Sequence, residues 1–489
     1  MTPLSLQALM PSMVLTAAIV VTMLAIAARR HHTLTAVLAG LGLVGVLLTL
    51  PLASRVTPRA VTALLLVDDY ALFFGGLVAT AALTVVAASY SYLHRWQGRR
   101  EEWYLLIMTA TLGALVLACA RHLAAVLVGL ELLSVSLFAL IGYARLQARP
   151  LEAALKYLIL AGVSSAFLLL GMALVYARLG VLDFDALARS SAVTPGLLLP
   201  AGCVLILVGL AFKLSLVPFH LWAPDVFEGA PAPVGGLLAT VSKGAIVALA
   251  LRYFEQGGGH QLQPLPTTLA LLAMASMLAG NLLALYQNDL KRVLACSSIA
   301  HFGYLLVALL AAGELAVESV GFYLMAYFVS TLAAFGVVTV VGMEATARPD
   351  ATSPGALEEG RLAHYRGLLW RRPLLAVVLL LALLSLAGLP ITAGFVAKLY
   401  VVAAGAASHA WALLTALVVG SVIGLFYYLR IAIVVADLEH ITAPAPPGWH
   451  WSQLPARLSL ALLGLSIPVI GILPGLGIVA SRAALPLGQ

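Results

Sequence analysis

Repeated apolar segments constrain this fold more than any other feature of the sequence. A helix that crosses a bilayer needs about 20 apolar residues. If each span and its loop together take about 35 residues, a chain of 489 residues holds about 14 spans. The pattern predicts an all-α polytopic membrane protein with about 14 transmembrane helices and no soluble domain. The expected spans are 8–28, 33–53, 70–93, 104–120, 122–144, 154–178, 197–220, 231–254, 266–287, 291–311, 316–343, 373–403, 408–436 and 456–480.

The composition excludes several classes of protein. Hydrophobic residues make up 62% of the chain and charged residues 10%, against about 45–50% and 25% in soluble domains. A soluble enzyme, a disordered chain and a nucleic-acid binder are therefore excluded despite the pI of 9.4. Cys119, Cys203 and Cys296 are scattered through apolar runs, so we expect neither a disulfide framework nor a metal site. The first apolar run is long enough to remain as a span, and we expect no cleaved signal peptide.

The basic residues predict the orientation in the membrane. If the N-terminus lies outside, most of the loop arginines fall on the inner side, which is the bias known for membrane proteins. Both termini are then expected on the outer side, and the net charge of +7 is mostly a topology signal. The longest hydrophilic segment, about 344–372, is expected to be an inner loop; it contains Arg348, Asp350, Glu358, Glu359, Arg361 and Arg366.

An internal repeat relates two parts of the chain. The segment "LEAALKYLILAGVSS" from Leu151 aligns with "VESVGFYLMAYFVST" from Val317, and the next span in each series contains a proline, Pro218 or Pro390. The copies are five spans apart, so they must cross the membrane in opposite directions. This pattern is typical of an inverted repeat with a discontinuous helix in each half. The expected segments are 1–103 (an N-terminal three-helix segment), 104–260 and 261–440 (the two five-helix repeats) and 441–489 (a C-terminal helix).

Ionisable residues inside predicted spans are the candidate functional groups. Glu131 lies near the centre of its span, where a charge is costly and usually functional. The alternative is a protonated glutamate bonded to a neighbouring helix. Lys213 and Lys243 also lie at membrane depth. Lys213 precedes the helix-breaking Pro218, so we expect it to meet water or a carboxylate.

Four further residues are also candidates for a role in proton transfer. Lys398 follows the second helix break, and His301 lies within the tenth span. If the helix resumes after Pro218, His220 lies two turns beyond Lys213 on a similar face, with a side chain suited to proton relay. Lys156 has Glu152 four residues before it, and such a pair is also an ordinary helix stabiliser. Either histidine could instead be a hydrogen-bonded core residue.

The distribution of these groups favours a proton relay over a solute site. One carboxylate and several lysines are spread over consecutive spans, whereas a solute site would concentrate polar groups in one pocket. Two charges about 4 Å apart interact by about 4 kcal/mol at an effective dielectric of 20. A neighbouring charge can therefore decide whether a buried lysine holds its proton. Asp225 and Glu228 are expected in a tight loop as solvated or capping residues.

Three stretches carry a family resemblance: "AFKLSLVPFHLWAPDVFEGAPAPV", "QNDLKRVLACSSIAHFGYLL" and "LSLAGLPITAGFVAKLYV". The chain resembles the antiporter-like membrane subunits of respiratory complex I over nearly its whole length. The resemblance implies a fold of 14 helices with two inverted five-helix units. It also implies proton-path roles: a pair of Glu131 and Lys213, the connecting Lys243, the second half-channel group Lys398, and accessory positions at His220 and Lys156.

The resemblance also implies where the chain works. We expect a multi-pass protein of the bacterial inner membrane, bound to other membrane-arm subunits and to lipids. It would hold no cofactor itself, with flavin, iron–sulfur clusters and quinone in other subunits. Proton translocation would be driven by quinone reduction elsewhere in the complex. The alternatives are a subunit of a multisubunit sodium/proton antiporter, a structural subunit that conducts nothing, and, less favoured, a solute carrier.

Overall fold

The computed structural model describes residues 2–482 except 95, 97, 146, 192–195, 257–259, 261–264, 312, 346–359 and 439–452. Among these residues, twelve helices are long and apolar enough to cross a membrane. They are α2 (Met10–Ala28), α3 (His32–Ala53), α4 (Asp69–His94), α5 (Glu101–Cys119), α6 (Leu123–Ile141), α7 (Ala148–Leu179), α11 and α12 (Ala232–Leu237 and Lys243–Gln256) joined by η2 (Leu238–Ser242), α13 (Leu265–Leu285), α14 (Leu290–Ala311), α15 (Glu314–Ala345), α19 (Trp411–Ala436) and α20 (Leu454–Ile472).

Two further crossings are broken helices. One consists of α9 (Leu198–Leu214) and α10 (Trp222–Gly229), and the other of α17 (Pro373–Ala387) and α18 (Ala393–Ala407). Together with the twelve long helices they account for the 14 predicted spans. The all-α fold with two inverted repeats and a discontinuous helix in each is confirmed, and the breaks occur at the two predicted prolines.

The breaks have local causes in the sequence. Helix α9 ends where Ser215 adopts a left-handed backbone with φ 59°, and α17 ends where Gly388 does so with φ 82°. A residue in this conformation reverses the chain direction after a helix and satisfies its last carbonyls. Pro218 and Pro390 come next and cannot continue a helix, so each span opens inside the bundle.

Short elements complete the chain at the two ends of the bundle. They are α1 (Pro3–Ala8), η1 (Ser54–Val56), the small sheet β1 and β2 (Arg59–Ala60 and Leu66–Val67), α8 (Phe184–Ser191), η3 (Leu362–Tyr365), α16 (Leu368–Arg371) and α21 (Pro474–Arg482). The predicted hydrophilic loop 344–372 is therefore partly helical. Its residues Arg348, Asp350, Glu358 and Glu359 lie outside the described residues.

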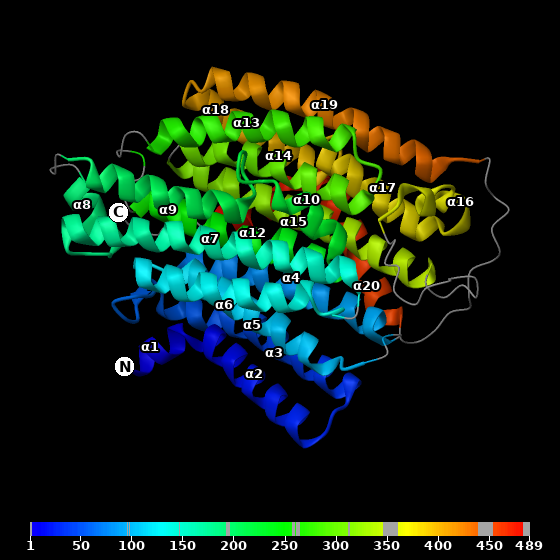
Figure 1. Cartoon of the computed structure of the whole chain (residues 1–489), viewed down its shortest axis with the longest axis horizontal. Helices are drawn as coiled ribbons and strands as arrows, with labels where there is room; N and C mark the ends of the chain where they lie inside the picture. The colour runs from blue at the N-terminus through cyan, green and yellow to red at the C-terminus, as the bar shows by residue number, and fades with distance from the viewer. Residues whose placement is uncertain are drawn as a thin grey trace.

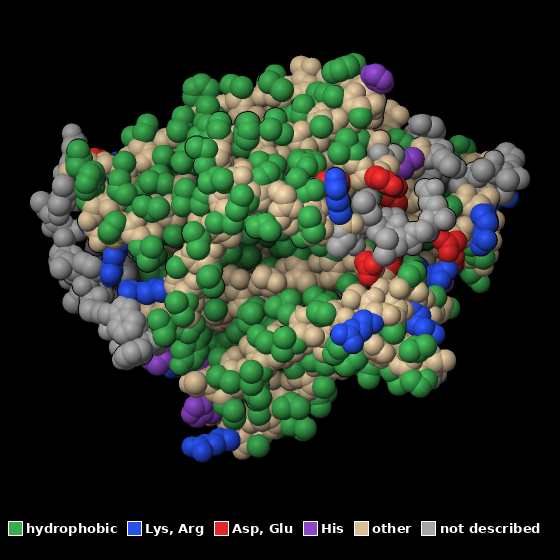
Figure 2. Space-filling model, turned by 180° about the vertical axis from the view of Figure 1, so that it is seen from behind, with side chains coloured by type: hydrophobic (Ala, Val, Ile, Leu, Met, Phe, Trp, Pro, Cys, Tyr) green, Lys and Arg blue, Asp and Glu red, His purple; other side chains and the backbone are tan. Residues whose placement is uncertain are grey.

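The helices lie side by side in one bundle, and both termini lie at the same end of it (Figure 1). We call this the terminal end; α7 and α14 begin at the opposite end. Hydrophobic side chains cover the broad middle of the surface, and charged side chains gather toward the two ends (Figure 2). Ile159 on α7 is 63% exposed, as expected of a side chain that faces lipid.

The core is densest where the two repeats meet. The crossing formed by α11, η2 and α12 is entirely buried over its most apolar window, and α14 is nearly so. These two central crossings carry Lys243 and His301. Two of the residues predicted to transfer protons, Lys243 and His301, therefore lie on the crossings that are best shielded from lipid.

Candidate functional site

Glu131 and Lys213 lie in one polar cluster but are not in direct contact. Lys213 Nζ donates a hydrogen bond to Ser134 Oγ at 2.6 Å, and Ser134 lies one turn after Glu131 on α6. Ser165 Oγ, on α7, donates to Glu131 Oε1 at 2.6 Å. Among the described residues no ion pair joins Glu131 to Lys213, so a serine hydroxyl stands where the family resemblance implied a direct pair.

Aromatic rings enclose the Lys213 ammonium. The side chain is 5% exposed, and its nitrogen lies 5.7 Å from the centre of the Tyr157 ring and 6.0 Å from that of Phe212. A cation is attracted to the face of such rings, most strongly where water is excluded. Lys213 is thus in direct contact with one hydroxyl and two rings rather than with a carboxylate.

Lys243 is fully buried at the junction of η2 and α12. Its nitrogen donates to Ser298 Oγ at 2.6 Å and lies 4.9 Å from the centre of the Phe302 ring. The η2 segment is a single π-helical turn, and such turns are frequent at functional sites because they re-aim the residues around them. The surroundings of Lys243 repeat the arrangement at Lys213: a serine and aromatic rings.

His301 belongs to a buried cluster of hydroxyl groups. Its Nδ1 lies 2.7 Å from Tyr323 OH and its Nε2 3.3 Å from Tyr428 OH. Tyr428 OH in turn shares a short hydrogen bond with Ser297 Oγ. Both ring nitrogens therefore have hydroxyl partners on other helices, and each hydroxyl can both donate and accept a proton.

Lys398 lies at the second helix break. Its Nζ donates to the carbonyl oxygen of Ala387, the last residue of α17, at 2.8 Å. The nitrogen also lies 5.2 Å from the centre of the Tyr304 ring. Tyr304 OH accepts a hydrogen bond from Asn281 at 2.7 Å. The freed carbonyl of the broken helix thus binds the lysine, as expected where a membrane helix opens.

The structure gives a different setting for His220 than the predicted one. Helix α9 ends at Leu214 and α10 begins at Trp222, so His220 lies in the break and not two helical turns beyond Lys213. Its Nδ1 is buried and has no hydrogen-bond partner. The histidine remains near the opened backbone, but the proposed shared helical face is wrong because the helix does not resume before it.

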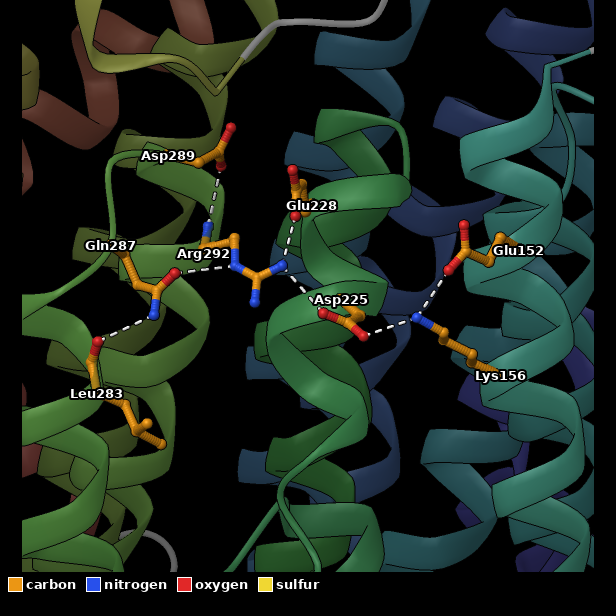
Figure 3. A network of polar contacts seen from close by, with 8 residues as sticks. All are labelled: Glu152, Lys156, Asp225, Glu228, Leu283, Gln287, Asp289 and Arg292. Atoms are coloured by element: carbon orange, nitrogen blue, oxygen red, sulfur yellow. Dashed lines mark hydrogen bonds and ion pairs between the residues drawn. The ribbon is translucent and has the colours of Figure 1, made fainter.

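Lys156 takes part in an ion-pair network at the end opposite the termini (Figure 3). Its Nζ lies 2.8 Å from both Glu152 and Asp225, and its side chain is 41% exposed. Arg292 on α14 contacts Asp225 at 3.0 Å and Glu228 at 2.5 Å. The predicted pair of Glu152 and Lys156 exists, but it belongs to a larger network that crosses from the first repeat to the second.

Sequence reasoning missed the residues that bind the predicted lysines. The segment with Asp225 and Glu228 is not a loop: it forms α10 and α11, with both carboxylates engaged by cations. Ser134 and Ser298 carried no signal in the sequence beyond an isolated polar residue in an apolar span. The three-residue spacing of Asp225 and Glu228, which places both on one helix face, was the available signal.

A polar cleft of about 640 Å³ opens beside this network. Its lining includes Arg149, Glu228, Asp289, Arg292 and Arg366. Asp289 lies in the turn before α14, where its carboxylate accepts a hydrogen bond from the backbone of Arg292 at 3.1 Å. Burial raises the pKa of the Asp289 carboxyl above its usual value. Of the network, Glu228 and Arg292 line this cleft and face it from the end opposite the termini.

Comparison with known proteins places the chain in a family. The family model for NADH:quinone oxidoreductase and Mrp antiporter membrane proteins matches residues 120–424. NADH-quinone oxidoreductase subunit N of Ectopseudomonas mendocina (strain ymp) is 47% identical over 99% of this chain and 97% of its own length.

Two solved structures contain chains with the same fold as this one. A chain of respiratory complex I from Thermus thermophilus with bound aureothin is 34% identical, with a TM-score of 0.80 over 97% of this chain and 100% of that one. A chain of the Mrp complex from Dietzia sp. DQ12-45-1b shares the fold at 21% identity, with a TM-score of 0.83 over 99% and 97%. This chain therefore belongs to the family of membrane subunits of NADH:quinone oxidoreductases and Mrp antiporters, as a homologue of subunit N.

Proposed function

We propose that this chain is a proton-translocating membrane-arm subunit of a bacterial NADH:quinone oxidoreductase. The observation that carries the proposal is the series of buried amines, each bonded to a neutral oxygen on another helix or across a helix break: Lys213 to Ser134, Lys243 to Ser298 and Lys398 to Ala387. A neutral partner stabilises the ammonium only moderately, so the amine can release a proton when a nearby charge changes.

The proposed path runs through both repeats. Protons would be taken up at the end that holds the polar cleft and Lys156. Lys213, with Glu131 in the same polar cluster and His220 in the helix break, would receive them in the first half. Lys243 and His301 would pass them on, and Lys398 would exchange with the terminal end. Segments 104–260 and 261–440 would serve as the two half-channels, flanked by 1–103 and 441–489.

The setting in the cell follows from the same proposal. The chain would span the bacterial inner membrane with both termini on the periplasmic side. It would bind other membrane-arm subunits and would hold no cofactor; flavin, iron–sulfur clusters and quinone would lie in other subunits. Quinone reduction there would drive the change of charge that displaces Lys213 relative to Glu131.

The test is NADH-driven proton pumping by the assembled complex in membrane vesicles. Glu131→Ala and Lys213→Ala are expected to lower pumping at least several-fold while the complex still assembles. Asp185→Asn is the matched control, because that carboxylate is exposed at the terminal end. Normal pumping in both assembled variants would contradict the relay and support a structural subunit that conducts nothing.

A sodium/proton antiporter subunit is the second candidate, favoured by the likeness in fold to the Mrp complex chain. The two functions differ in what purifies with the chain. A complex I subunit is expected with flavin and iron–sulfur proteins and with NADH oxidation. Cation exchange in a complex that lacks those proteins would overturn our first choice.

A further inference from the structure

Helix α10 lies between Lys213 and Lys243, and its apolar face contacts the surroundings of both. Trp222 packs against Tyr157 and Phe212, with ring centres 5.3 Å apart in each case, and these are the two rings that flank Lys213. At the other end of the helix, the Phe227 ring centre lies 5.8 Å from Lys243 Nζ.

The two lysines have separate hydrogen-bond partners. Lys213 bonds Ser134 on α6, and Lys243 bonds Ser298 on α14. In the described part of the chain no hydrogen bond joins one lysine to the other. The aromatic rings of α10 offer no group that carries a proton, so a transfer between the lysines requires these rings to move and water to enter.

The polar face of α10 forms hydrogen bonds and ion pairs with both repeats (Figure 3). Asp225 uses one carboxylate oxygen for Lys156 on α7 at 2.8 Å and the other for Arg292 on α14 at 3.0 Å. The C-terminal end of α10 is also bound to α14, because Lys291 Nζ donates to the carbonyl oxygen of Ala230 at 3.0 Å. Glu228, by contrast, bonds Arg292 and has no bond to α7.

The packing of α10 leaves the helix little room to move while these hydrogen bonds and ion pairs are intact. A Cβ atom on Gly229 would lie 2.6 Å from Ala153 Cβ, so α10 and α7 touch closely at that point. Phe227 also packs on Phe335 of α15, with ring centres 5.9 Å apart. The helix comes after a non-helical break of turns at residues 215–221, so it can pivot there when its polar contacts change.

Taking the proposed function as given, we propose that α10 is a gate between the two lysines. Trp222 and Phe227 keep the space between Lys213 and Lys243 dry, and Asp225 is the positioning residue that holds the gate closed through Lys156 and Arg292. A shift of α7 relative to α14 pulls on this one carboxylate, so movement of one repeat against the other opens the path.

The experiment uses the purified complex in proteoliposomes and measures two quantities: passive proton leak and protons pumped per NADH. Asp225→Asn keeps the shape of the side chain and removes its charge. We expect the leak to rise several-fold and the protons pumped per NADH to fall at least two-fold. Asp185→Asn is the control, because this carboxylate is exposed and lies outside the network of α10; it is expected to stay close to the unmodified complex in both measurements.

A second pair of variants tests the rings without touching the ion pairs. Phe227→Ala and Trp222→Ala are expected to leak in the same way, whereas Phe227→Leu and Trp222→Phe, which preserve bulk, are expected to leak less. If an alanine variant does not assemble, its bulk-preserving counterpart is compared with the unmodified complex and should still show a measurable leak.

Three results would overturn the gate. One is a tight membrane with normal pumping in assembled Asp225→Asn and both ring variants. The second is reduced pumping with a tight membrane in Asp225→Asn, which would mean that Asp225 itself conducts protons. The third is a leak in Asp185→Asn equal to that in Asp225→Asn. Failure of the proposed function is distinguishable, because it appears as normal pumping in Glu131→Ala and Lys213→Ala.

Discussion

The residues bonded to the buried lysines are neutral, and this determines how easily those lysines can exchange protons. A buried ammonium without any partner is very costly, whereas a carboxylate in contact would hold the proton firmly. A serine hydroxyl or a backbone carbonyl lies between these limits. Lys213, Lys243 and Lys398 all have this intermediate kind of partner.

Ser134 is the residue whose removal tests this arrangement most directly. Ser134→Ala deletes the acceptor for Lys213, and hydrogen bonds to charged groups contribute about 1.5–3 kcal/mol. We expect NADH-driven proton pumping to fall roughly ten-fold with the complex still assembled. Ser134→Thr retains a hydroxyl and is expected to keep most of the activity; equal pumping by the two variants would contradict the role of the hydroxyl.

The burial of several single charged residues could not be predicted from the sequence. Lys291 stands at the first position of the expected span 291–311, where a lysine can reach water, yet it is 1% exposed and donates to Ala230 O. Lys156, placed inside a span, is partly exposed. Arg252 lies near the end of the expected span 231–254, but it is 2% exposed. Hydropathy locates a residue along the membrane normal; it contains no information on which neighbouring helix covers the side chain.

The buried pair of Arg252 and Asp68 gives a stability prediction. Both terminal guanidinium nitrogens bond the Asp68 carboxylate, at 2.8 and 2.7 Å, and tie α12 to the start of α4. Asp68→Ala leaves the guanidinium buried without its counter-charge, which is expected to cost about 3–5 kcal/mol of folding stability.

The measurement for this pair is the amount of folded chain retained in the membrane as temperature rises. Asp185→Ala removes an exposed partner of Arg121 and serves as the control, with an expected change below about 1 kcal/mol. If Asp68→Ala is no less stable than this control, the pair does not anchor α12.

At the scale of elements, the positions of the two breaks were predictable from the sequence, but the helix after the first break was not. Proline and the residues before it predict a helix end, and both breaks were placed correctly at Pro218 and Pro390. The short helix α10 was taken for a loop because its proline and glycine, Pro224 and Gly229, favour turns. Burial of its apolar face against α7 and α14 overrides that local preference.

The second break requires a glycine at position 388 for two reasons. Its φ of 82° is unfavourable for other residues, and a Cβ there would lie 2.7 Å from Lys398 Cδ. Gly388→Ala is therefore expected to displace the lysine from the Ala387 carbonyl and to reduce proton pumping several-fold. Gly180→Ala shares the left-handed backbone, with φ 68°, but meets no atom within 4 Å.

The comparison of these two alanine variants separates the effect of backbone strain from the effect of displacing Lys398. Both carry a left-handed backbone penalty of about 1–2 kcal/mol, and both are expected to lose a similar amount of thermal stability. Only Gly388→Ala is expected to pump less in assembled complex. Equal loss of pumping in the two variants would mean that backbone strain, and not the position of Lys398, limits activity.

For the molecule as a whole, the inverted repeat determines where the proposed proton path would begin and end. The two broken helices open inside the bundle, and the polar cleft lies at the end opposite the termini. The sequence sufficed for this architecture because every span must be apolar and about 20 residues long. The contacts between repeats were not predictable, since they join residues such as Asp225 and Arg292 that are far apart in the chain.

The orientation of the bundle is the remaining prediction, and two exposed residues test it. Leu197, before α9, is 87% exposed at the terminal end, and Tyr286, after α13, is 83% exposed at the opposite end. The three native cysteines are buried, so labelling of the unmodified chain should be low. With the excess of arginine facing inward, Leu197→Cys should react with a membrane-impermeant maleimide added to intact spheroplasts, and Tyr286→Cys should react only in inverted vesicles. The reverse pattern would place the termini inside, and the polar cleft would then open to the periplasm, on the wrong side for proton uptake.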